Sequence, residues 1–432
     1  TLLLASYPRE KAGTALALVL LPACGTQLPA FMQPWHQIDT LALFGLLLVV
    51  GLLAGEWLRA RFGVPKIVGY VLAGTLFGPS LLSWISVEAL TQARPIADAS
   101  LGLLLMEAGR RLDLRWLLGN PSLLRATAAD VLLSFVAIFF FAWALVGLSP
   151  GWAAATAAVT MASAPAVVLL TVEESSAQGQ VTERVILHTA IATAVSFVLF
   201  ALVLGFVHAE LSADWINAVA HPLWVAAGAA LIAWGTARLT LVVAARLPKR
   251  SLAQVFVLVA MALLAVGVAR MLAVPVFLTL FVMGALLAFD DRRQTLAYTQ
   301  LPEAHWLLAI ILFVIVGASL PWQEFTWLTA LQALGLLLVR AAAKSAAAFI
   351  GGRDLPRTKR LWVGLGIQPL SATAVFMAYE IAALYPEVGR SALLLPLLAA
   401  AIMEIAGPVL CRLALVRAGE TAGDGEKKGG IA

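Results

Sequence analysis

The chain has 432 residues, 62% of them hydrophobic and 12% charged, and its mean hydropathy is +0.94. A soluble domain keeps roughly a quarter of its residues charged, so the composition excludes a soluble globular protein and indicates an integral membrane protein with many spans. The formal charge of +5 does not indicate nucleic-acid binding, because the basic residues lie in short clusters between apolar segments.

The first 37 residues form a separate N-terminal segment. Arg9 and Lys11 precede the apolar run "TALALVLLPAC", which is short for a membrane span and is typical of a signal peptide. The end of this run, "LPAC", resembles a lipobox, in which Cys24 would be the lipidated residue. An interfacial extension is the alternative interpretation. Cys24 and Cys411 have no metal-ligand spacing.

Apolar segments of spanning length then follow one another through residues 38–415. They predict an all-α polytopic membrane protein with about thirteen transmembrane helices, because the short alternating segments of a membrane barrel do not occur. The segments are 38–60, 66–84, 95–110, 122–147, 152–173, 182–208, 217–246, 251–270, 273–290, 304–320, 325–350, 361–383 and 390–413. The polar, glycine-rich tail at 416–432 is predicted to be disordered and cytoplasmic.

The loops between these segments alternate between basic and nearly uncharged. One set carries most of the Lys and Arg residues, including Arg59, Arg110, Arg184, Arg292 and Arg353. Because cytoplasmic loops are enriched in Lys and Arg, this set is predicted to be cytoplasmic. The start of the first span then lies outside and the C-terminus inside, in a bacterial inner membrane.

Two of the apolar segments are interrupted by proline among small and hydroxyl residues. They are "TMASAPAVV" (160–168) in the fifth segment and "GLGIQPLSATAV" (364–375) in the twelfth. Proline removes a backbone donor, and the freed carbonyls survive in a membrane only beside protein or a wet cavity. Paired interruptions an odd number of helices apart predict a transporter built from inverted repeats, with a site at midplane. Two ordinary proline kinks are the alternative.

Several longer stretches resemble one family of transporters. The stretches are "VPKIVGYVLAGTLFGPSLL" (64–82), "LGLLLMEAGRRLDLRWL" (101–117), "LTLFVMGALLAFDD" (278–291), "LLAIILFVIVGASLPW" (307–322) and "VRAAAKSAAAFIGG" (339–352). In order and spacing they resemble the monovalent cation:proton antiporter-2 family (CPA2 type). The resemblance covers most of 38–415 and implies a sodium/proton antiporter-like fold. Its core domain would contain two crossed discontinuous helices, here the fifth and twelfth segments, and would move against a panel domain that forms a homodimer interface.

The resemblance also implies a mid-membrane aspartate, which this sequence lacks. The matching stretch is "ILHTAIATAVSF" (186–197), where the family's Asp positions fall on or near Thr193 and Ala194. After the second break the family often carries Arg-Gly-Glu, and this chain has Leu370, Ser371 and Ala372. Both departures remove charge, so this chain is predicted to be a divergent member without the usual ion-binding aspartates.

The candidate ion site therefore consists mainly of neutral oxygens. Broken-helix carbonyls and hydroxyls can replace the hydration shell of Na⁺ or K⁺ at close range. The candidate residues are Thr160, Ser163, Pro165, Thr193, Gln368, Pro369, Ser371, Thr373 and Lys344. No cofactor or resident metal is expected, only the transported Na⁺, K⁺ or H⁺.

Lys344 is the charge that relatives pair with the missing aspartate. A lone ammonium in the bilayer is costly, so Lys344 is expected to lose its charge, find a new partner or be reached by water. Arg340, one turn earlier, repels it. The alternative is that both side chains extend toward the cytoplasm.

Four other titratable residues lie inside predicted spans. Glu107, His188 and Glu404 are possible proton carriers, since His exchanges protons near neutrality and buried acids can be protonated. For each we also keep a structural alternative: an ion pair of Glu107 with Arg110 and Arg111, a satisfied interhelical donor for His188, and a protonated acid bonded to a neighbouring helix for Glu404. Asp130 is expected to start the fourth span and to stabilise its N-terminal dipole.

The leading expectation is a secondary transporter that exchanges a monovalent cation, Na⁺ or K⁺, for a proton by alternating access. The alternatives are an uncoupled uniporter or channel-like pathway, an anion carrier on the same fold, and a transport-inactive membrane sensor. An enzyme is not expected, because the sequence shows no nucleophile–base pair or phosphate loop. The expected partners are the cation, the proton, membrane lipid and a second copy of the chain. The sequence leaves the ion and its coupling to protons open.

Overall fold

The computed structural model describes residues 40–112, 119–212, 215–248, 252–291, 302–370, 372–385 and 389–421. The chain divides into two units, Thr1–Phe44 and Gly45–Ala432. Of the first unit only residues 40–44 are described, so the signal-like segment and Cys24 lie outside the described residues, as does the tail from residue 422 onward. The domain boundaries at 37 and 415 remain predictions.

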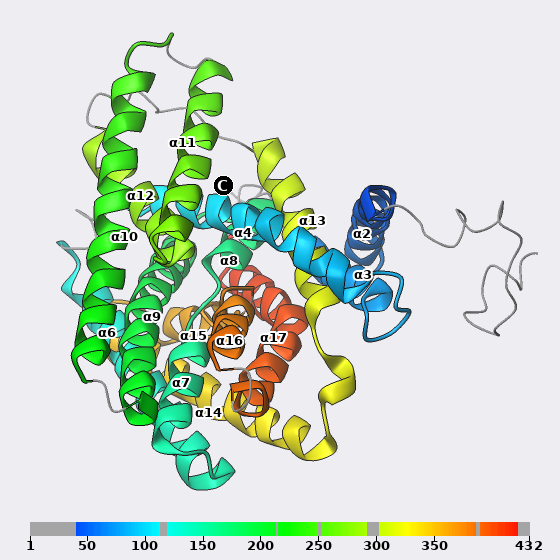
Figure 1. Cartoon of the computed structure of the whole chain (residues 1–432), viewed down its shortest axis with the longest axis vertical. Coiled ribbons are helices and arrows are strands. Elements are labelled where there is room, and N and C mark those ends of the chain that lie inside the picture. The colour runs from blue at the N-terminus through cyan, green and yellow to red at the C-terminus, as the bar shows by residue number, and fades with distance from the viewer. Residues whose placement is uncertain are drawn as a thin grey trace, which may run out of the picture. The chain divides into compact units, whose positions relative to one another are not determined.

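Every regular element in the described residues is helical, which confirms the prediction of an all-α protein (Figure 1). The elements are α2 (Thr40–Phe62), α3 (Lys66–Phe77), α4 (Val87–Arg110), α6 (Pro121–Phe140), η2 (Phe141–Val146), α7 (Pro150–Thr160), α8 (Pro165–Ser175), α9 (Gln180–Ser212), α10 (Trp215–Ala244), α11 (Leu252–Met271), α12 (Val276–Asp290), α13 (Pro302–Ser319), η3 (Trp322–Glu324), α14 (Trp327–Gly351), α15 (Arg357–Gly366), α16 (Ala372–Leu384) and α17 (Gly389–Arg417).

The predicted membrane segments correspond to these helices. Eight helical stretches in the described residues are long and apolar enough to cross a membrane, and three more are apolar but shorter. Each predicted segment overlaps one α-helix, except the fifth and twelfth, which each overlap a pair; the fourth also covers η2, which continues α6. The predicted start of the third segment at 95 is wrong. Helix α4 begins at Val87, where the Ser86 hydroxyl accepts from the Ala89 N–H, and Pro95 lies inside it.

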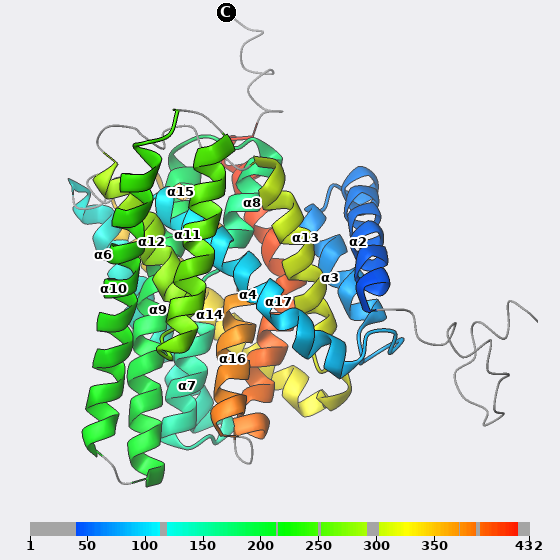
Figure 2. The same ribbon diagram turned by 45° about the horizontal axis from the view of Figure 1, so that its top comes forward.

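The helices of the second unit pack in two groups. Helices α3, α4 and α10–α13 pack mainly on one another, and we call them the panel bundle. Helices α6–α9 and α14–α17 likewise form what we call the core bundle. Figures 1 and 2 show α10, α11 and α12 side by side in the panel bundle and α16 beside α17 in the core bundle. The consecutive helices α9 and α10 join the two bundles.

Glycine allows a close helix approach in the panel bundle, between α4 and α12. A Cβ atom added to Gly109 would lie 2.2 Å from the Phe281 carbonyl oxygen, and one added to Gly284 would lie 2.0 Å from the Met106 carbonyl oxygen. Small residues let membrane helices pack backbone against backbone. These two glycines therefore determine how closely α4 and α12 can pack.

Both predicted interruptions are present in the core bundle. Helix α7 ends at Thr160 and α8 begins at Pro165, while α15 ends at Gly366 and α16 begins at Ala372. The two breaks meet, because the Ser163 hydroxyl donates to the Ile367 carbonyl at 3.2 Å. This confirms the prediction of two discontinuous helices that come together at their breaks.

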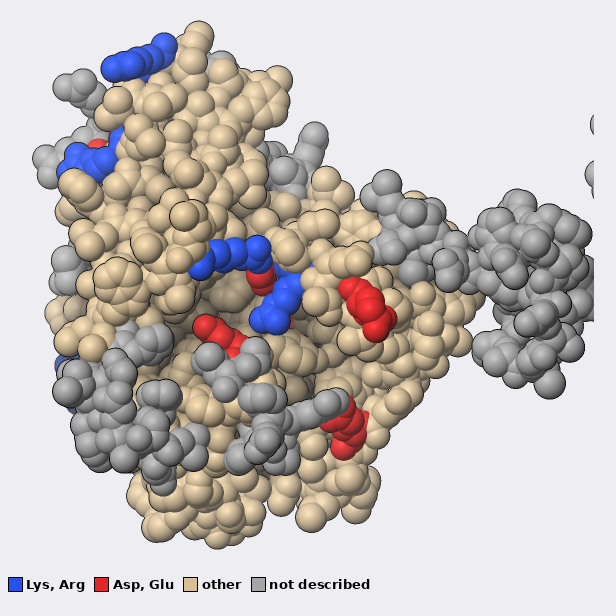
Figure 3. All heavy atoms as spheres, viewed as in Figure 1, with Lys and Arg blue, Asp and Glu red and all other residues tan. Residues whose placement is uncertain are grey.

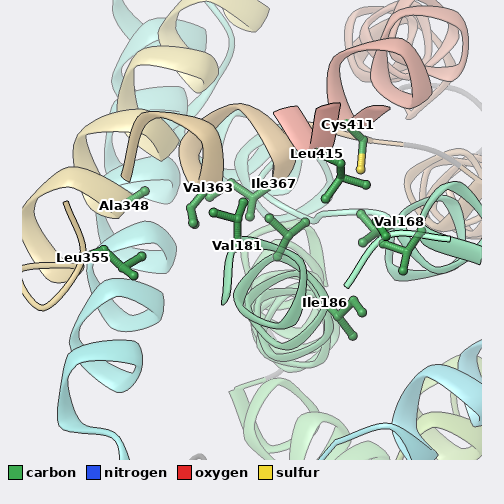
Figure 4. Packing of buried hydrophobic residues seen from close by; sticks show 12 residues of the cluster. Val168, Val181, Ile186, Ala348, Leu355, Val363, Ile367, Cys411 and Leu415 are labelled. Carbon is green, nitrogen blue, oxygen red and sulfur yellow. The ribbon is translucent and has the colours of Figure 1, made fainter. Parts of the chain in front are cut away.

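A cluster of buried aliphatic residues packs one side of the breaks (Figure 4). It joins α8, α9, α14, α15 and α17 through Val168, Val181, Ile186, Ala348, Val363, Ile367, Cys411 and Leu415. In a membrane, such packing holds helices together by van der Waals contact rather than by removal from water. Because Ile367 belongs both to this cluster and to the second break, the cluster holds that break against α8 and α9.

Candidate functional site

Two opposite charges meet beside the break between α7 and α8. The Lys344 ammonium donates to Asp130 Oδ2 at 2.8 Å and to the Ser163 hydroxyl at 3.0 Å. Both side chains are fully buried. A buried ion pair survives only when each charge has good hydrogen-bonding partners. Of the outcomes expected for Lys344, the structure shows a new partner, Asp130. The alternative, in which the Lys344 side chain extends toward the cytoplasm, is wrong.

Asp130 does not start a span, which corrects the prediction for this residue. Helix α6 begins at Pro121, more than two turns earlier, so the N-terminal dipole is not the feature that Asp130 serves. Besides Lys344, Asp130 has two partners. The Ser134 hydroxyl donates to Oδ1 at 2.8 Å, and His188 Nε2 lies 2.9 Å from Oδ2. The centre thus contains a carboxylate that the sequence analysis placed elsewhere.

His188 lies between two residues of α6. Its Nδ1 atom is 3.4 Å from the Thr127 hydroxyl, and its Nε2 atom faces Asp130. The ring is fully buried. These contacts match the alternative of a satisfied interhelical histidine, and its role as a proton carrier stays a prediction.

The Arg340 guanidinium donates hydrogen bonds to backbone carbonyl groups of both breaks. Its Nε donates to the Thr160 oxygen at 2.7 Å and Nη2 to the Ala162 oxygen at 2.8 Å. On the other side, Nη1 donates to the Gln368 carbonyl oxygen at 2.6 Å and Nη2 lies 3.5 Å from the Pro369 oxygen. The Arg340 side chain is fully buried. The alternative prediction, in which it extends toward the cytoplasm, is therefore wrong. The carbonyls expected to bind the ion are therefore hydrogen-bonded to a guanidinium.

The predicted hydroxyl ligands differ in their surroundings. Thr160 donates to the Thr156 carbonyl at 2.6 Å, and Thr193 donates to the carbonyls of Ser163 and Thr189, both at 2.7 Å. The hydroxyl of Thr373 is buried and meets no hydrogen-bond partner among the described residues. The same holds for the Thr156 hydroxyl, which the sequence analysis did not select. Ser371 lies outside the described residues.

The three remaining candidates of the breaks have backbone roles. Pro165 is the first residue of α8. The Gln368 side-chain oxygen accepts from Arg340 at 3.3 Å and the side-chain nitrogen donates to the Gly364 carbonyl at 2.8 Å, which fixes the amide. Pro369 approaches α17, where a Cβ atom added to Gly407 would lie 2.9 Å from its Cα.

The two acidic candidates lie in other helices. Glu107 is 3.1 Å from Arg110 Nη1 and 3.6 Å from Arg111 Nε, so the predicted ion pairs within α4 are present. Glu404 is fully buried in α17, one turn before Gly407. Neither lies in α6 or α14, the helices of Asp130 and Lys344, and their roles as proton carriers stay predictions.

A pocket opens near His188 on the side where α9 begins. It has a volume of about 600 Å³ and is lined by Arg111, Gly179, Gln180, Glu183, Arg184, Leu187, Asp354 and Leu355. Leu187 precedes His188 in the chain, so the pocket reaches the turn of α9 that carries the histidine. At its edge Arg184 and Ser122 both contact the Asp354 carboxylate.

The pKa of Asp354 is below the ordinary value for a carboxyl group. Partial burial raises this pKa, but the hydrogen bond from Ser122 and the contact with Arg184 outweigh it. Asp354 is therefore charged at neutral pH and holds α6, α9 and the link between α14 and α15 together.

Charged side chains are few on the face drawn in Figure 3. Most of this face is uncharged, and a small group of basic and acidic side chains gathers around a hollow in its middle, over α4, α11 and α16. Among the residues of these helices, Arg270 of α11 pairs with Asp98 of α4. A largely uncharged surface agrees with the membrane location that the composition predicts.

Two roles were not predicted from the sequence. Asp130 is the ion-pair partner of Lys344, and Arg340 donates hydrogen bonds to the carbonyls of the breaks. A signal for Asp130 exists in the sequence. Thr127, Asp130 and Ser134 are spaced by three and four residues, which places these polar groups on one face of an apolar helix. Within the described residues, no group of three or more His, Cys, Asp and Glu side chains is placed to hold a resident metal ion.

Comparison with known proteins gives one family and one fold. The family described as "Sodium/hydrogen exchanger, transmembrane" matches residues 43–408. The sodium proton antiporter MjNhaP1 from Methanocaldococcus jannaschii, solved at pH 8, is similar in fold, with a TM-score of 0.65 and 17% identity over 87% of this chain and 95% of that chain. A second structure of that antiporter gives a TM-score of 0.62 and 17% identity over 90% and 96%. Comparison with curated protein sequences gives no match.

Proposed function

Because the chain belongs to the transmembrane sodium/hydrogen exchanger family, we propose that it exchanges Na⁺ or K⁺ for protons and that Asp130 is the carboxylate on which the two ions alternate. Membership of this family makes the chain a cation:proton antiporter and an integral membrane protein, not an enzyme. The observation that carries the proposed site is the buried contact of Asp130 with Lys344 beside the breaks.

The exchange follows from the charges at this centre. The Lys344 ammonium neutralises Asp130 in the arrangement described. A proton or a metal cation that reaches Asp130 can take the place of the ammonium, and Lys344 keeps a second contact at the Ser163 hydroxyl. Since one carboxylate accepts only one of these partners at a time, carrying the cation excludes carrying the proton.

Alternating access requires the core bundle to move against the panel bundle. Their contact includes an ion pair at the end of α8, between Glu173 and Arg111, which directly follows α4. The next residue of α8, Glu174, lies 3.3 Å from Arg59 of α2. These pairs would have to break or shift when the site changes the side to which it opens.

The membrane setting belongs to the same proposal. We place the end of the molecule that carries Arg59, Arg111 and Arg184 in the cytoplasm, because basic loops stay inside. The membrane is the bacterial inner membrane, and the protein works as a homodimer through its panel bundle. The hydroxyls of Ser163, Thr193 and Thr373 supply neutral oxygens for the transported ion.

Transport in proteoliposomes tests the proposal. Vesicles that hold a pH dye are given Na⁺ or K⁺ outside, with a set pH gradient. The wild type is expected to move protons in response to the cation, and Asp130→Asn to fall to the level of empty vesicles. Asp98→Asn is the matched control, because Asp98 pairs with Arg270 in the panel bundle, and it should retain transport.

The results separate this function from its alternatives. Equal proton movement by the wild type and Asp130→Asn would contradict the role of Asp130. Anion-dependent flux without proton movement would instead support an uncoupled carrier. That second candidate is favoured by two buried cationic side chains beside the breaks, Arg340 and Lys344.

A further inference from the structure

His188 connects Asp130 to a different helix. Asp130 belongs to α6, and two of its partners come from elsewhere in the chain, Lys344 from α14 and His188 from α9. Ser134, which also contacts the carboxylate, lies one turn further along α6 itself and therefore moves together with Asp130. When a transported ion takes the place of Lys344, the contact with His188 still holds Asp130 from another helix.

The partners of His188 determine which ring nitrogen carries the hydrogen. The Asp130 carboxylate is paired with an ammonium and only accepts hydrogen bonds, so the Nε2 atom at 2.9 Å has to donate. The Thr127 hydroxyl lies 3.4 Å from Nδ1 and can donate to that atom when it carries no hydrogen.

The ring of His188 is neutral in this arrangement. It is fully buried, and α14 already brings the positive charges of Arg340 and Lys344 to this part of the core bundle. A third buried positive charge beside one carboxylate would be costly, because a buried charge needs its own counter-charge. His188 therefore acts on Asp130 as a neutral hydrogen-bond donor.

Helix α9 also holds the second residue that Lys344 contacts. The Lys344 ammonium lies between Asp130 Oδ2 and the Ser163 hydroxyl. Thr193, five residues after His188 on α9, donates to the Ser163 carbonyl at 2.7 Å. Five residues of an α-helix extend over about 7.5 Å along its axis. One short stretch of α9 thus holds both residues between which the ammonium lies.

A fixed spacing prepares these two residues for a cation. A cation that replaces the ammonium meets Asp130 and Ser163 already in place, so their ordering does not have to be paid for on binding. Without the contact from His188, Asp130 would be free to adjust its distance from Ser163 to whichever ion arrives. Binding sites that adjust in this way are less selective than rigid ones.

We propose that His188 is a positioning residue, whose neutral ring ties Asp130 to α9, keeps the distance between Asp130 and Ser163 when Lys344 leaves, and so makes the site select its cation by size. The inference rests on the proposed exchange at Asp130. It gives His188 no part in carrying the proton, because the ring keeps its one hydrogen on Nε2.

Two amide variants separate positioning from packing. In His188→Gln the amide nitrogen reaches about as far as Nε2 and can still donate to Asp130. In His188→Asn the shorter side chain ends near the position of Nδ1, so it can reach Thr127 but not Asp130. Both variants place an uncharged amide in the same buried space. Proton movement in proteoliposomes, measured over a range of Na⁺ and of K⁺ concentrations, gives KM for each cation.

The ratio of the two KM values is the readout. The wild type and His188→Gln should prefer the same cation by a similar factor, and His188→Asn is expected to bring the ratio close to one. A loss of packing alone would change the amount of active protein and hence the maximal rate, but not this ratio. The same ratio in all three proteins would overturn the proposal.

The tautomer of His188 provides a second measurement, which is needed if His188→Asn does not fold. Nitrogen NMR of protein with isotope-labelled histidine reports it, and the signal that disappears in His188→Gln belongs to His188. We expect a neutral ring with its hydrogen on Nε2. Hydrogen on Nδ1 alone, or on both nitrogens, would overturn the proposal. If this tautomer is found but the wild type shows no cation-driven proton movement, the proposed exchange fails while the hold of His188 on Asp130 is supported.

Discussion

Lys344 and Asp130 neutralise each other where neither side chain reaches solvent. Lys344→Met leaves the Asp130 carboxylate buried without this partner. Breaking a buried ion pair from one side costs about 3–5 kcal/mol, whereas neutral replacement of both partners is far less costly. We therefore expect Lys344→Met to lower the melting temperature strongly, and Asp130→Asn with Lys344→Met to recover most of it.

Transport by the same variants separates stability from function. The double variant should remain inactive in proteoliposomes, because its stability returns without a titratable carboxylate. If the double variant is less stable than Lys344→Met, the two residues do not form the coupled pair described here.

Asp354 gives a pH dependence at the edge of the pocket. Its pKa is lower in the folded protein than in an ordinary carboxyl group, so it stabilises the fold above the unfolded value of about 4. This stabilisation is lost as the pH falls through the folded pKa. The melting temperature of the wild type should therefore drop more steeply below about pH 4 than that of Asp354→Asn. Parallel pH profiles of the two proteins would count against this account of Asp354.

The residues of the centre were only partly predictable from the sequence. Proline and hydroxyl residues mark the breaks, so Thr160, Ser163 and Gln368 could be placed near the crossing. The partner of Lys344 could not be identified, because Asp130 lies on α6, and the packing of α6 on α14 determines which residues face each other. Arg340 and Lys344 were expected to repel each other, but each instead has its own acceptors.

At the scale of elements, the end of α17 supports the start of α9. The Glu420 carboxylate accepts from the backbone N–H groups of Val181 and Thr182 at 3.0 and 2.8 Å. It acts as an N-cap for α9, since Gly179, just before the helix, has no side chain. A Cβ atom added to Gly179 would lie 2.2 Å from the Glu420 Cδ, so this contact requires glycine.

Glu420→Ala should therefore destabilise the protein by about 1 kcal/mol, as loss of a helix cap does. Amide hydrogen exchange should rise at the first turn of α9 and little elsewhere. Glu88→Ala, at an exposed glutamate in the first turn of α4, is the control and should show neither effect. Unchanged exchange in α9 would show that Glu420 does not cap it.

Helix positions were well predicted because apolar length and proline act locally. The boundaries of most segments agree with the helices within a few residues, and both interruptions were found. The exception is α4, where polar residues and Pro95 concealed its first two turns from an interpretation based on hydropathy.

At the scale of the molecule, the two interrupted helices supply a pair of C-terminal ends that meet at one point. Sequence symmetry predicted this arrangement, and the match to the exchanger family over 43–408 supports it. The charged side chains beside this meeting point come from α6 and α14, which do not belong to the interrupted pair. The sequence predicted a charge-poor site, and the proposed site adds a carboxylate from a different helix, Asp130 of α6.

In the proposed exchange, a cation and a proton compete for Asp130. This competition can be measured as proton release, followed with a pH dye, when Na⁺ or K⁺ is added to purified protein in weakly buffered detergent solution. The wild type should release protons in a saturable way, and Asp130→Asn should release none. Cation-dependent release that persists undiminished in Asp130→Asn would contradict it.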